Sequence, residues 1–368
     1  MPHKYTSVHY NDYLKLDDIL SSQKLRSEAV GTPAHDEMLF IIVHQAYELW
    51  FKQIIHELTA IRNDFMTDAI DERSIFQAVG RLDRVIKIQS LLIDQISVLE
   101  TMTPLDFLDF RSYLFPASGF QSLQFRKIEI LLGLKEEQRM TYNKKPYHTV
   151  FDEDKKQELF DIQDQGTLID WVEKWLERTP FLKFRGFNFI EQFKKSVEAM
   201  HKKELKEIRE SEYLEEESRN NRIQMIEKTQ EYFNKILDPK VHEELREKGE
   251  WTLSYEATIA ALLIRLYQEE PILHMPQLLL TRLMDIDEIF TNWRYRHAQM
   301  VLRMLGRKTG TGGSSGHEYL KETAHQHQIY TDLHQISTLL IPRSELPPLP
   351  EDLKKELGFF FTIQSSAS

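Results

Sequence analysis

The chain has 368 residues, of which 41% are hydrophobic and 29% charged, so it can bury a large core and is too apolar to be disordered. Its net charge of −11 argues against nucleic acid or an anionic membrane surface as a partner, because both attract clustered lysine and arginine. The lack of cysteine excludes disulfides, cysteine nucleophiles, zinc–cysteine sites and iron–sulfur clusters.

The first residues, MPHKYTSVHYNDYL, do not show a charged segment followed by an apolar one. No run in the chain approaches the ~20 apolar residues of a membrane span. We therefore expect a soluble, cytoplasmic protein with no membrane partner. Any metal or haem must be held by His, Met, Tyr or carboxylates.

Helical spacing of apolar residues begins early in the chain. Residues 32–63 predict a long helix with Thr32 as its N-cap and Pro33 at its first position. Residues 75–100 predict a second helix, and residues 105–132 predict a third that is interrupted at FPASGF.

The second half of the chain is also helical in pattern. Residues 187–238 contain no Gly or Pro and interleave Lys, Glu and Arg, which predicts a solvated helical pair. Residues 254–268 and 281–305 predict two more apolar-striped helices, and no alternation typical of strands is convincing. We therefore predict an all-α helical bundle. The expected division is 1–133 with 251–340 as the main domain, 134–250 as a charged helical insertion, and 341–368 as a Pro-rich, then loose tail.

Two histidines lie on apolar helix faces. In FIIVHQAYELWF, His44 shares a face with Phe40, Tyr47 and Glu48, and His297 lies among apolar positions four residues after Trp293. Each one fits an ordinary core histidine, but two on different helices also fit a haem or metal site. A di-iron carboxylate site, which needs Glu-x-x-His pairs, is poorly supported, because the pair at 322–325 includes neither His44 nor His297 and neither of these histidines belongs to such a pair.

Arg111 lies in the aromatic stretch DFLDFRSYLFPASGFQSLQFR, near Phe107 and Leu114. One interpretation is an arginine that extends to solvent or pairs with Asp106 or Asp109. The other is a guanidinium that binds a carboxylate at an apolar cleft.

The segment GRKTGTGGSSG at 306–316 is rich in glycine but fits neither a phosphate-binding P-loop nor a dinucleotide fingerprint. GGSSG does satisfy G-x-S-x-G, with Ser314 as a nucleophile and Asp332 and His334 following in triad order. A serine hydrolase is thus one alternative, although a helix rather than a strand leads into the segment. A non-catalytic helical scaffold is the other alternative.

Three long blocks, HDEMLFIIVHQAYELWFKQI, DFLDFRSYLFPASGFQSLQFR and WRYRHAQMVLRMLGRKTGTGGSSGHEYL, resemble the tryptophan 2,3-dioxygenase family. YNDYLKLDDIL and WVEKWLERTPFL extend the resemblance from about residue 5 to about residue 340. It implies an all-α enzyme with a helical-bundle haem domain and one haem b per subunit. Such an enzyme inserts O2 across the indole C2–C3 bond of L-tryptophan to give N-formyl-L-kynurenine, the first step of the kynurenine pathway of tryptophan degradation.

The resemblance also implies roles for individual residues. His297 would be the axial ligand of the haem iron, with Trp293 and Gly119 beside the haem, and His44 would face the indole N–H. The substrate contacts that it implies are Phe40, Ile41, Ile42, Val43, His44, Phe107, Arg111, Leu114, Ser118, Gly119, Thr311, Tyr10 and Tyr13.

Among these residues, Arg111 would bind the substrate carboxylate and Thr311 the amino-acid end. The glycine-rich segment would close over the bound substrate. Tyr10 and Tyr13 would enter a neighbouring subunit's pocket, which implies a homotetramer, a dimer of dimers with exchanged N-terminal segments. The chain departs from some bacterial members at Phe107, where they carry tyrosine, so one hydroxyl contact near the carboxylate is missing here.

Overall fold

The computed structural model describes residues 7–139, 146–306, 308 and 316–358. Helices dominate this part of the chain, which confirms the all-α fold. One short antiparallel hairpin, β1 (Lys183–Phe184) with β2 (Phe187–Asn188), was not expected from the sequence.

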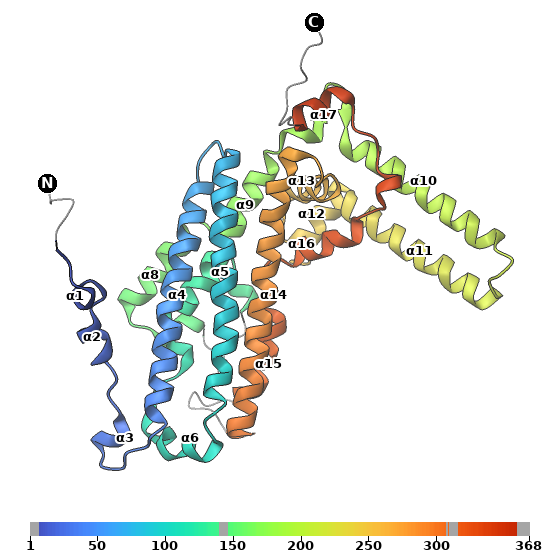
Figure 1. Cartoon of the computed structure of the whole chain (residues 1–368). Coiled ribbons are helices and arrows are strands. Elements are labelled where there is room, and N and C mark those ends of the chain that lie inside the picture. Colours follow the sequence, from blue (N-terminus) through green and yellow to red (C-terminus); the bar gives the residue numbers. More distant parts are fainter. Residues whose placement is uncertain (1–6, 140–145, 307, 309–315, 359–368) are drawn as a thin grey trace, which may run out of the picture.

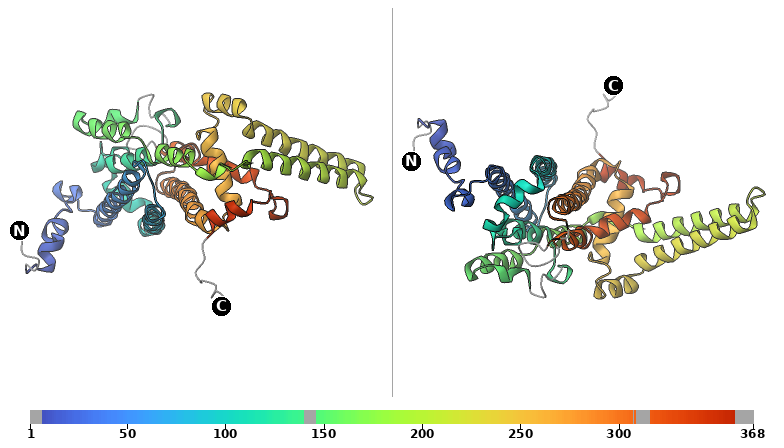
Figure 2. Two further views of the ribbon diagram at one scale, coloured as in Figure 1. Left: turned by 90° about the horizontal axis from the view of Figure 1, so that it is seen from above. Right: turned by 90° about the horizontal axis from the view of Figure 1, so that it is seen from below.

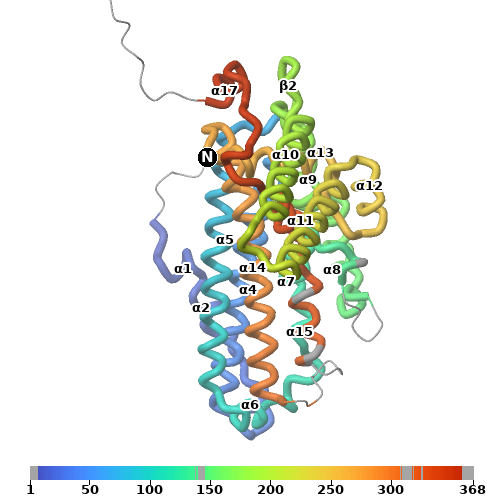
Figure 3. The backbone as a smooth tube through the Cα atoms, turned by 90° about the vertical axis from the view of Figure 1, so that its right-hand side faces the viewer, coloured from blue at the N-terminus to red at the C-terminus, as the bar shows by residue number. Residues whose placement is uncertain are grey.

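Three long helices lie side by side at the centre of the molecule (Figure 1, Figure 3). They are α4 (Glu37–Phe65), α5 (Glu72–Leu99) and α14 (Pro271–Leu305). The elements packed around them are α6 (Pro104–Arg111), η1 (Ser112–Leu114), η2 (Gly119–Gln121), α7 (Leu123–Leu132), η3 (Glu136–Gln138), η4 (Tyr147–Val150), α8 (Glu153–Asp164), α9 (Leu168–Glu177), η5 (Pro180–Leu182), α13 (Tyr255–Leu266), α15 (Gly316–Gln326), α16 (Thr331–Gln335) and η6 (Ile336–Leu339).

The predicted start of the first long helix at Thr32 is wrong, because α4 begins at Glu37. The Glu37 carboxylate instead accepts hydrogen bonds from the backbone N–H groups of Arg26 and Ser27, each at 2.9 Å. The Ser27 hydroxyl in turn accepts from the N–H of Ala34 at 3.0 Å. These bonds hold residues 30–36 in turns, so the long helix starts at Glu37 rather than after Thr32.

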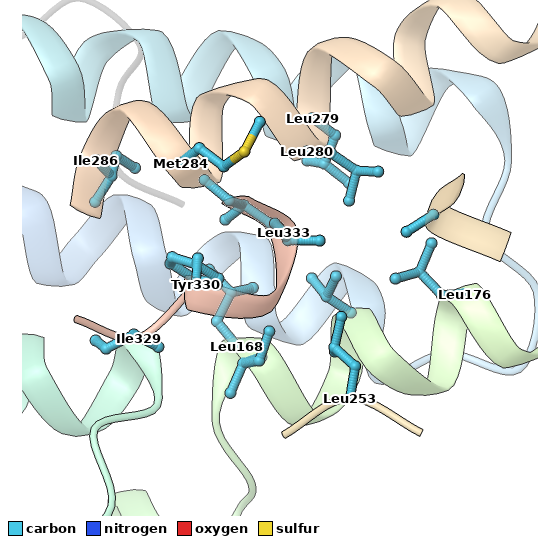
Figure 4. Packing of buried hydrophobic residues seen from close by; sticks show 14 of the residues in the cluster. Leu168, Leu176, Leu253, Leu279, Leu280, Met284, Ile286, Ile329, Tyr330 and Leu333 are labelled. Carbon is cyan, nitrogen blue, oxygen red and sulfur yellow. The ribbon is translucent and has the colours of Figure 1, made fainter. Parts of the chain in front are cut away.

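The hydrophobic core runs along the three central helices, from Val43 to Phe65 on α4 and from Ile75 to Leu99 on α5, and continues into the elements beside them (Figure 4). Leu279 and Leu280 of α14 are fully buried, and Leu168 of α9 and Leu253 are 1% exposed. Tyr330 is also 1% exposed, and its hydroxyl donates to the carbonyl of Leu132 at 3.3 Å. Because this core joins α9, which belongs to the predicted insertion, to the central helices, it crosses a predicted domain boundary, and the division into domains stays a prediction.

The charged stretch forms the expected helical pair, α10 (Phe189–Glu210) and α11 (Glu216–Leu237), followed by α12 (Pro239–Glu247). Together α10 and α11 form an arm that projects from the body of the molecule (Figure 1, Figure 2). At its base Phe193 and Phe233 are buried and stack with ring centroids 6.4 Å apart. Tyr213, between the two helices, is 98% exposed.

The two ends of the described chain behave differently. The helices α1 (Tyr10–Leu14) and α2 (Leu16–Leu20) contain no buried residue and lie beside the bundle, followed by α3 (Arg26–Ala29) (Figure 1). The Pro-rich tail holds η7 (Arg343–Glu345) and α17 (Glu351–Leu357). Leu353 and Leu357 of α17 are buried in the core, so the tail is less extended than predicted. Residues 359–368, which we expected to be loose, lie outside the described residues.

None of the helices in the described part of the chain is both long and apolar enough to cross a membrane.

Candidate active site

A cavity of about 680 Å³ lies between α4, α6, α7, α14 and α15. Most of the surface that faces the cavity is apolar, although polar and ionisable side chains also line it. The predicted site residues that line it are Phe40, Ile41, His44, Phe107, Arg111, Leu114, Ser118, Gly119, Trp293 and His297. Chain segments more than 250 residues apart thus meet at this cavity.

Other predicted site residues lie elsewhere. Ile42 is 48% exposed, and Val43 is buried in the core on another side of α4. Tyr10 and Tyr13 are each 75% exposed and are not part of this chain's own cavity wall. Thr311 lies outside the described residues.

His44 is held on α4 by its Nδ1 atom, which lies 2.7 Å from the carbonyl oxygen of Phe40. Because a carbonyl only accepts, Nδ1 carries the proton and Nε2 of the neutral ring is left as an acceptor. Burial within the protein lowers the pKa of His44, against a smaller opposing effect of the bond to Phe40. His44 lines the cavity, so it presents a neutral acceptor there.

His297 faces the same cavity from α14. Burial lowers its pKa to about 4, and nearby His44 adds to this effect. The ring stacks on Trp293, with centroids 5.5 Å apart and planes inclined by 13°. A neutral, oriented imidazole is the form in which histidine binds a metal.

Arg111 ends α6, a helix that begins with a capping box between Thr103 and Asp106. The cap and the fully buried Phe110 fix this short helix against the bundle. Phe107 lies next to Phe40, with ring centroids 5.8 Å apart. Arg111 thus lines the same cavity as these two aromatic rings, and a charge-assisted bond from an arginine to a carboxylate is strong at such a site.

Several side chains on the cavity wall were not predicted as site residues from the sequence. Glu48 lies one helical turn after His44, and its carboxylate accepts bonds from Ser122 and Gln124. Tyr319, Thr323 and other residues of α15 also line the cavity. The i, i+4 spacing from His44 was a signal for Glu48, whereas nothing in the sequence indicates which residues of α15 face the cavity.

A buried ionic cluster, defined here as Glu129 with Arg126, Arg139, Arg294 and His327, lies at the same cavity and also escaped the sequence analysis. One Glu129 oxygen accepts from Arg126 at 2.8 Å and Arg139 at 2.7 Å. The other oxygen accepts from Arg294 at 3.2 Å and His327 at 3.4 Å. Burial alone would raise the pKa of Glu129, but the guanidinium groups hold it well below its usual value.

The residues present fit a haem. The cavity is largely apolar and has room for a flat macrocycle, and His297, which lines it with a pKa lowered to about 4, could supply the one nitrogen ligand that a porphyrin-bound iron needs from a protein. Within the described ranges, no group of three or more His, Asp or Glu side chains is arranged to hold a metal ion.

The fold and cavity together define an all-α protein with two neutral histidines facing one apolar ligand cavity. The chain belongs to the tryptophan 2,3-dioxygenase family, whose model matches residues 2–340. Among the relatives, the tryptophan 2,3-dioxygenase of Bdellovibrio bacteriovorus is 46% identical over 97% of this chain and 100% of its own length. Those of Dictyostelium discoideum and Mayetiola destructor are 45% and 47% identical, over 97% and 95% of this chain and 89% and 90% of their own.

The chain is therefore an enzyme of this family, and the comparisons give no support to the serine hydrolase or scaffold alternatives. Ser314 lies outside the described residues. Asp332 is buried and accepts bonds from the backbone N–H groups of Thr252 and Leu253, both at 2.7 Å. His334 pairs with Glu288 at 3.7 Å. Both candidate triad partners thus have other contacts.

Proposed function

We propose that the enzyme adds both atoms of O2 to the indole C2–C3 bond of L-tryptophan, giving N-formyl-L-kynurenine, with one haem b per subunit in the cavity described above. The observation that carries this proposal is the pair of neutral histidines, His44 and His297, on two helices facing one apolar cavity. Bound there, the haem supplies the activation of O2. His297 would hold the iron, beside Trp293 and Gly119.

The rest of the cavity would position the substrate. Phe40, Phe107 and Leu114 provide apolar surface for the flat indole ring. Arg111 would bind the carboxylate, and Ser118 and Gly119 would border the ring from the turn between η1 and α7. Holding the substrate in one orientation can lower a barrier by several kcal/mol, because freedom of motion is lost on binding rather than during reaction.

His44 would accept a hydrogen bond from the indole N–H. Its Nδ1 proton is engaged with the Phe40 carbonyl, so Nε2 is the free acceptor of the ring. We assign it an orienting role, because the indole N–H is a very weak acid and the pKa of His44 is lowered rather than raised. The proton therefore stays on the indole while the hydrogen bond fixes the ring edge.

A homotetramer with exchanged N-terminal segments would complete each site. The support is that α1 and α2 contain no buried residue within one subunit. The large side chains Tyr10, Tyr13 and Leu20 on these helices are each at least 73% exposed. Apolar surface of this kind is usually covered in an assembly. Tyr10 and Tyr13 would then border the substrate of the neighbouring subunit.

One experiment tests the reaction and the iron ligand together. Haem-loaded, reduced protein is mixed with L-tryptophan in air-saturated buffer, and N-formyl-L-kynurenine is followed by its absorbance. We expect product from the unaltered enzyme, and loss of both product and the haem Soret band in His297→Ala. Haem binding without product would remove the substrate assignment, and normal haem binding by His297→Ala would remove the ligand assignment.

The exchange of N-terminal segments is tested by subunit mixing. An Arg111→Leu subunit has a defective cavity but an intact N-terminal segment. A subunit with both Tyr10→Ala and Tyr13→Ala has an intact cavity but a defective N-terminal segment. Co-expressed, the two should regain activity, because a sound cavity would receive tyrosines from the other subunit. Activity no greater than the sum of the separate variants would contradict the exchange.

A further inference from the structure

The residues that follow η1 form a turn on the cavity wall. Residues 118–122, here called the distal turn, all line the cavity. The N–H of Ser118 donates to Gln121 Oε1 at 3.2 Å, and the N–H of Phe120 donates to the Ser118 hydroxyl at 3.4 Å. These bonds fix the shape of the turn, but they do not attach it to α4, the helix that carries His44.

Glu48 makes that attachment. Its Oε1 accepts from the Ser122 hydroxyl at 2.6 Å, and its Oε2 accepts from Gln124 Nε2 at 2.9 Å. Gln124 Nε2 also lies 2.6 Å from the backbone carbonyl of Glu48. The carboxylate thus joins α4 to the last residue of the distal turn and to the first turn of α7.

The Ser122 hydroxyl has a second contact. While its proton is donated to Glu48, its oxygen accepts from the N–H of Phe125 at 3.2 Å and caps α7. The Phe125 ring packs on Trp293, with centroids 5.3 Å apart, and Trp293 stacks on His297. The position of Glu48 therefore affects both the distal turn and the wall beside His297.

The choice of glutamate has a chemical reason. Two neutral donors, Ser122 and Gln124, need two acceptor atoms, and a carboxylate offers two oxygens where a glutamine amide offers one. A carboxylate at an apolar cavity is costly unless its hydrogen bonds are made. With both bonds made, rotation of the Glu48 carboxylate and of Ser122 is restricted.

From this geometry we propose that Glu48 is a positioning residue: its carboxylate sets the separation between His44 and the distal turn, and so the width of the slot for the flat ring of the substrate. This rests on the proposed function, in which that ring lies between His44 and the turn. Glu48 itself acts through Ser122 and Gln124. The consequence is selectivity between unsubstituted and ring-substituted tryptophans.

The test measures kcat and KM for L-tryptophan and for 6-methyl-L-tryptophan with haem-loaded Glu48→Ala and Glu48→Gln. Loss of both charge-assisted bonds in Glu48→Ala should raise KM for L-tryptophan about tenfold or more, with a smaller effect on kcat. The preference for L-tryptophan over its 6-methyl form should also shrink. Glu48→Gln keeps the volume and one acceptor, so it should fall between Glu48→Ala and the unaltered enzyme.

Two serine variants supply matched comparisons. Ser122→Ala should reproduce the loss of selectivity, because it removes the group that Glu48 holds. Ser254→Ala removes an equivalent cap, the bond from the Ala257 N–H at 3.2 Å, at a residue that does not line the cavity. It should lower thermal stability while leaving KM and selectivity unchanged.

The outcomes separate the two proposals. If the unaltered enzyme makes no product, the proposed function fails. If it is active and the Glu48 variants match it in KM and selectivity, the positioning role is overturned. A fall in kcat alone, or equal effects of Ser254→Ala and Ser122→Ala on selectivity, would also overturn it. Should Glu48→Ala fail to fold, Glu48→Gln and Ser122→Ala carry the test.

Discussion

Replacing Glu129 by glutamine should severely destabilise the protein. The glutamine keeps nearly the same volume, so little is lost in packing, but Arg126, Arg139 and Arg294 lose the carboxylate that they share. All three arginines are buried, with at most 8% of each residue exposed. Removing one partner of a buried ion pair costs about 3–5 kcal/mol, because the remaining charge is uncompensated. That loss is a large part of the ~5–15 kcal/mol that stabilises a typical fold.

The ion pairs of Glu129 also make the free energy of unfolding depend on pH. The pKa of Glu129 in the folded protein lies well below the ordinary glutamate value of 4.5, so the stabilising effect of its ion pairs is complete above pH 4.5 and is lost as the pH falls through the folded-state pKa. The difference in unfolding free energy between the unaltered protein and Glu129→Gln should therefore be constant from about pH 8 to pH 5, and shrink in more acidic solution.

The assay is urea unfolding followed by helical circular dichroism, at equal haem content because a bound ligand raises apparent stability. Glu158→Gln is the matched control: Glu158 pairs with Lys127, but its side chain is 51% exposed, so the change should stay within about 1 kcal/mol. A Glu129→Gln effect no larger than that of Glu158→Gln would refute the account of the buried ionic cluster.

Three further outcomes are expected. Arg111→Leu should weaken L-tryptophan binding by at least ~2 kcal/mol in a spectral titration, and tryptamine, which lacks the carboxylate, should be a poor substrate; equal turnover of tryptamine would contradict the carboxylate contact. Burial lowers the pKa of His44 from 6.5, so kcat/KM should be unchanged down to pH 6.5. It should fall only in more acidic solution, where the ring gains a proton and can no longer accept a hydrogen bond. A fall in kcat/KM that begins above pH 6.5 would count against a neutral His44. Ser314→Ala should retain full dioxygenase activity, and its loss would reopen a role for that serine.

The long helices were predictable from the sequence because their apolar residues repeat with helical spacing. The ends were less so. The sequence places the start of the last long helix at 281, but α14 begins at Pro271 and includes Pro276. Pro276 lies in the second turn of α14, where it obscures the helical pattern and removes one backbone hydrogen-bond donor. Burial of Leu273 and Leu279 on the same helix offsets the lost hydrogen bond.

The site could be predicted only where a residue type was distinctive on a helix face. His44, His297 and Arg111 stood out as polar groups among aromatic ones. Ile42 and Val43 were predicted as substrate contacts together with their neighbours in the chain, but they do not line the cavity. Successive residues of a helix face different directions, so a continuous stretch cannot line one cavity.

The buried ionic cluster was out of reach for a different reason. Glu129 and Arg294 are 165 positions apart, and no local pattern connects them. The same holds for Glu48 and Ser122, which are 74 positions apart. Pairings of this kind follow from how the helices pack, which a single sequence does not specify.

The projecting arm offers a practical handle on the enzyme. Tyr213 lies in the chain between α10 and α11, the two helices of the arm in Figure 1, and 98% of its surface is exposed. The described residues that line the cavity include none from the arm. Because the chain has no cysteine, Tyr213→Cys would introduce a single thiol for a fluorescent or affinity label. Immobilised through that point, the enzyme could be loaded with haem and substrate while its cavity faces free solution.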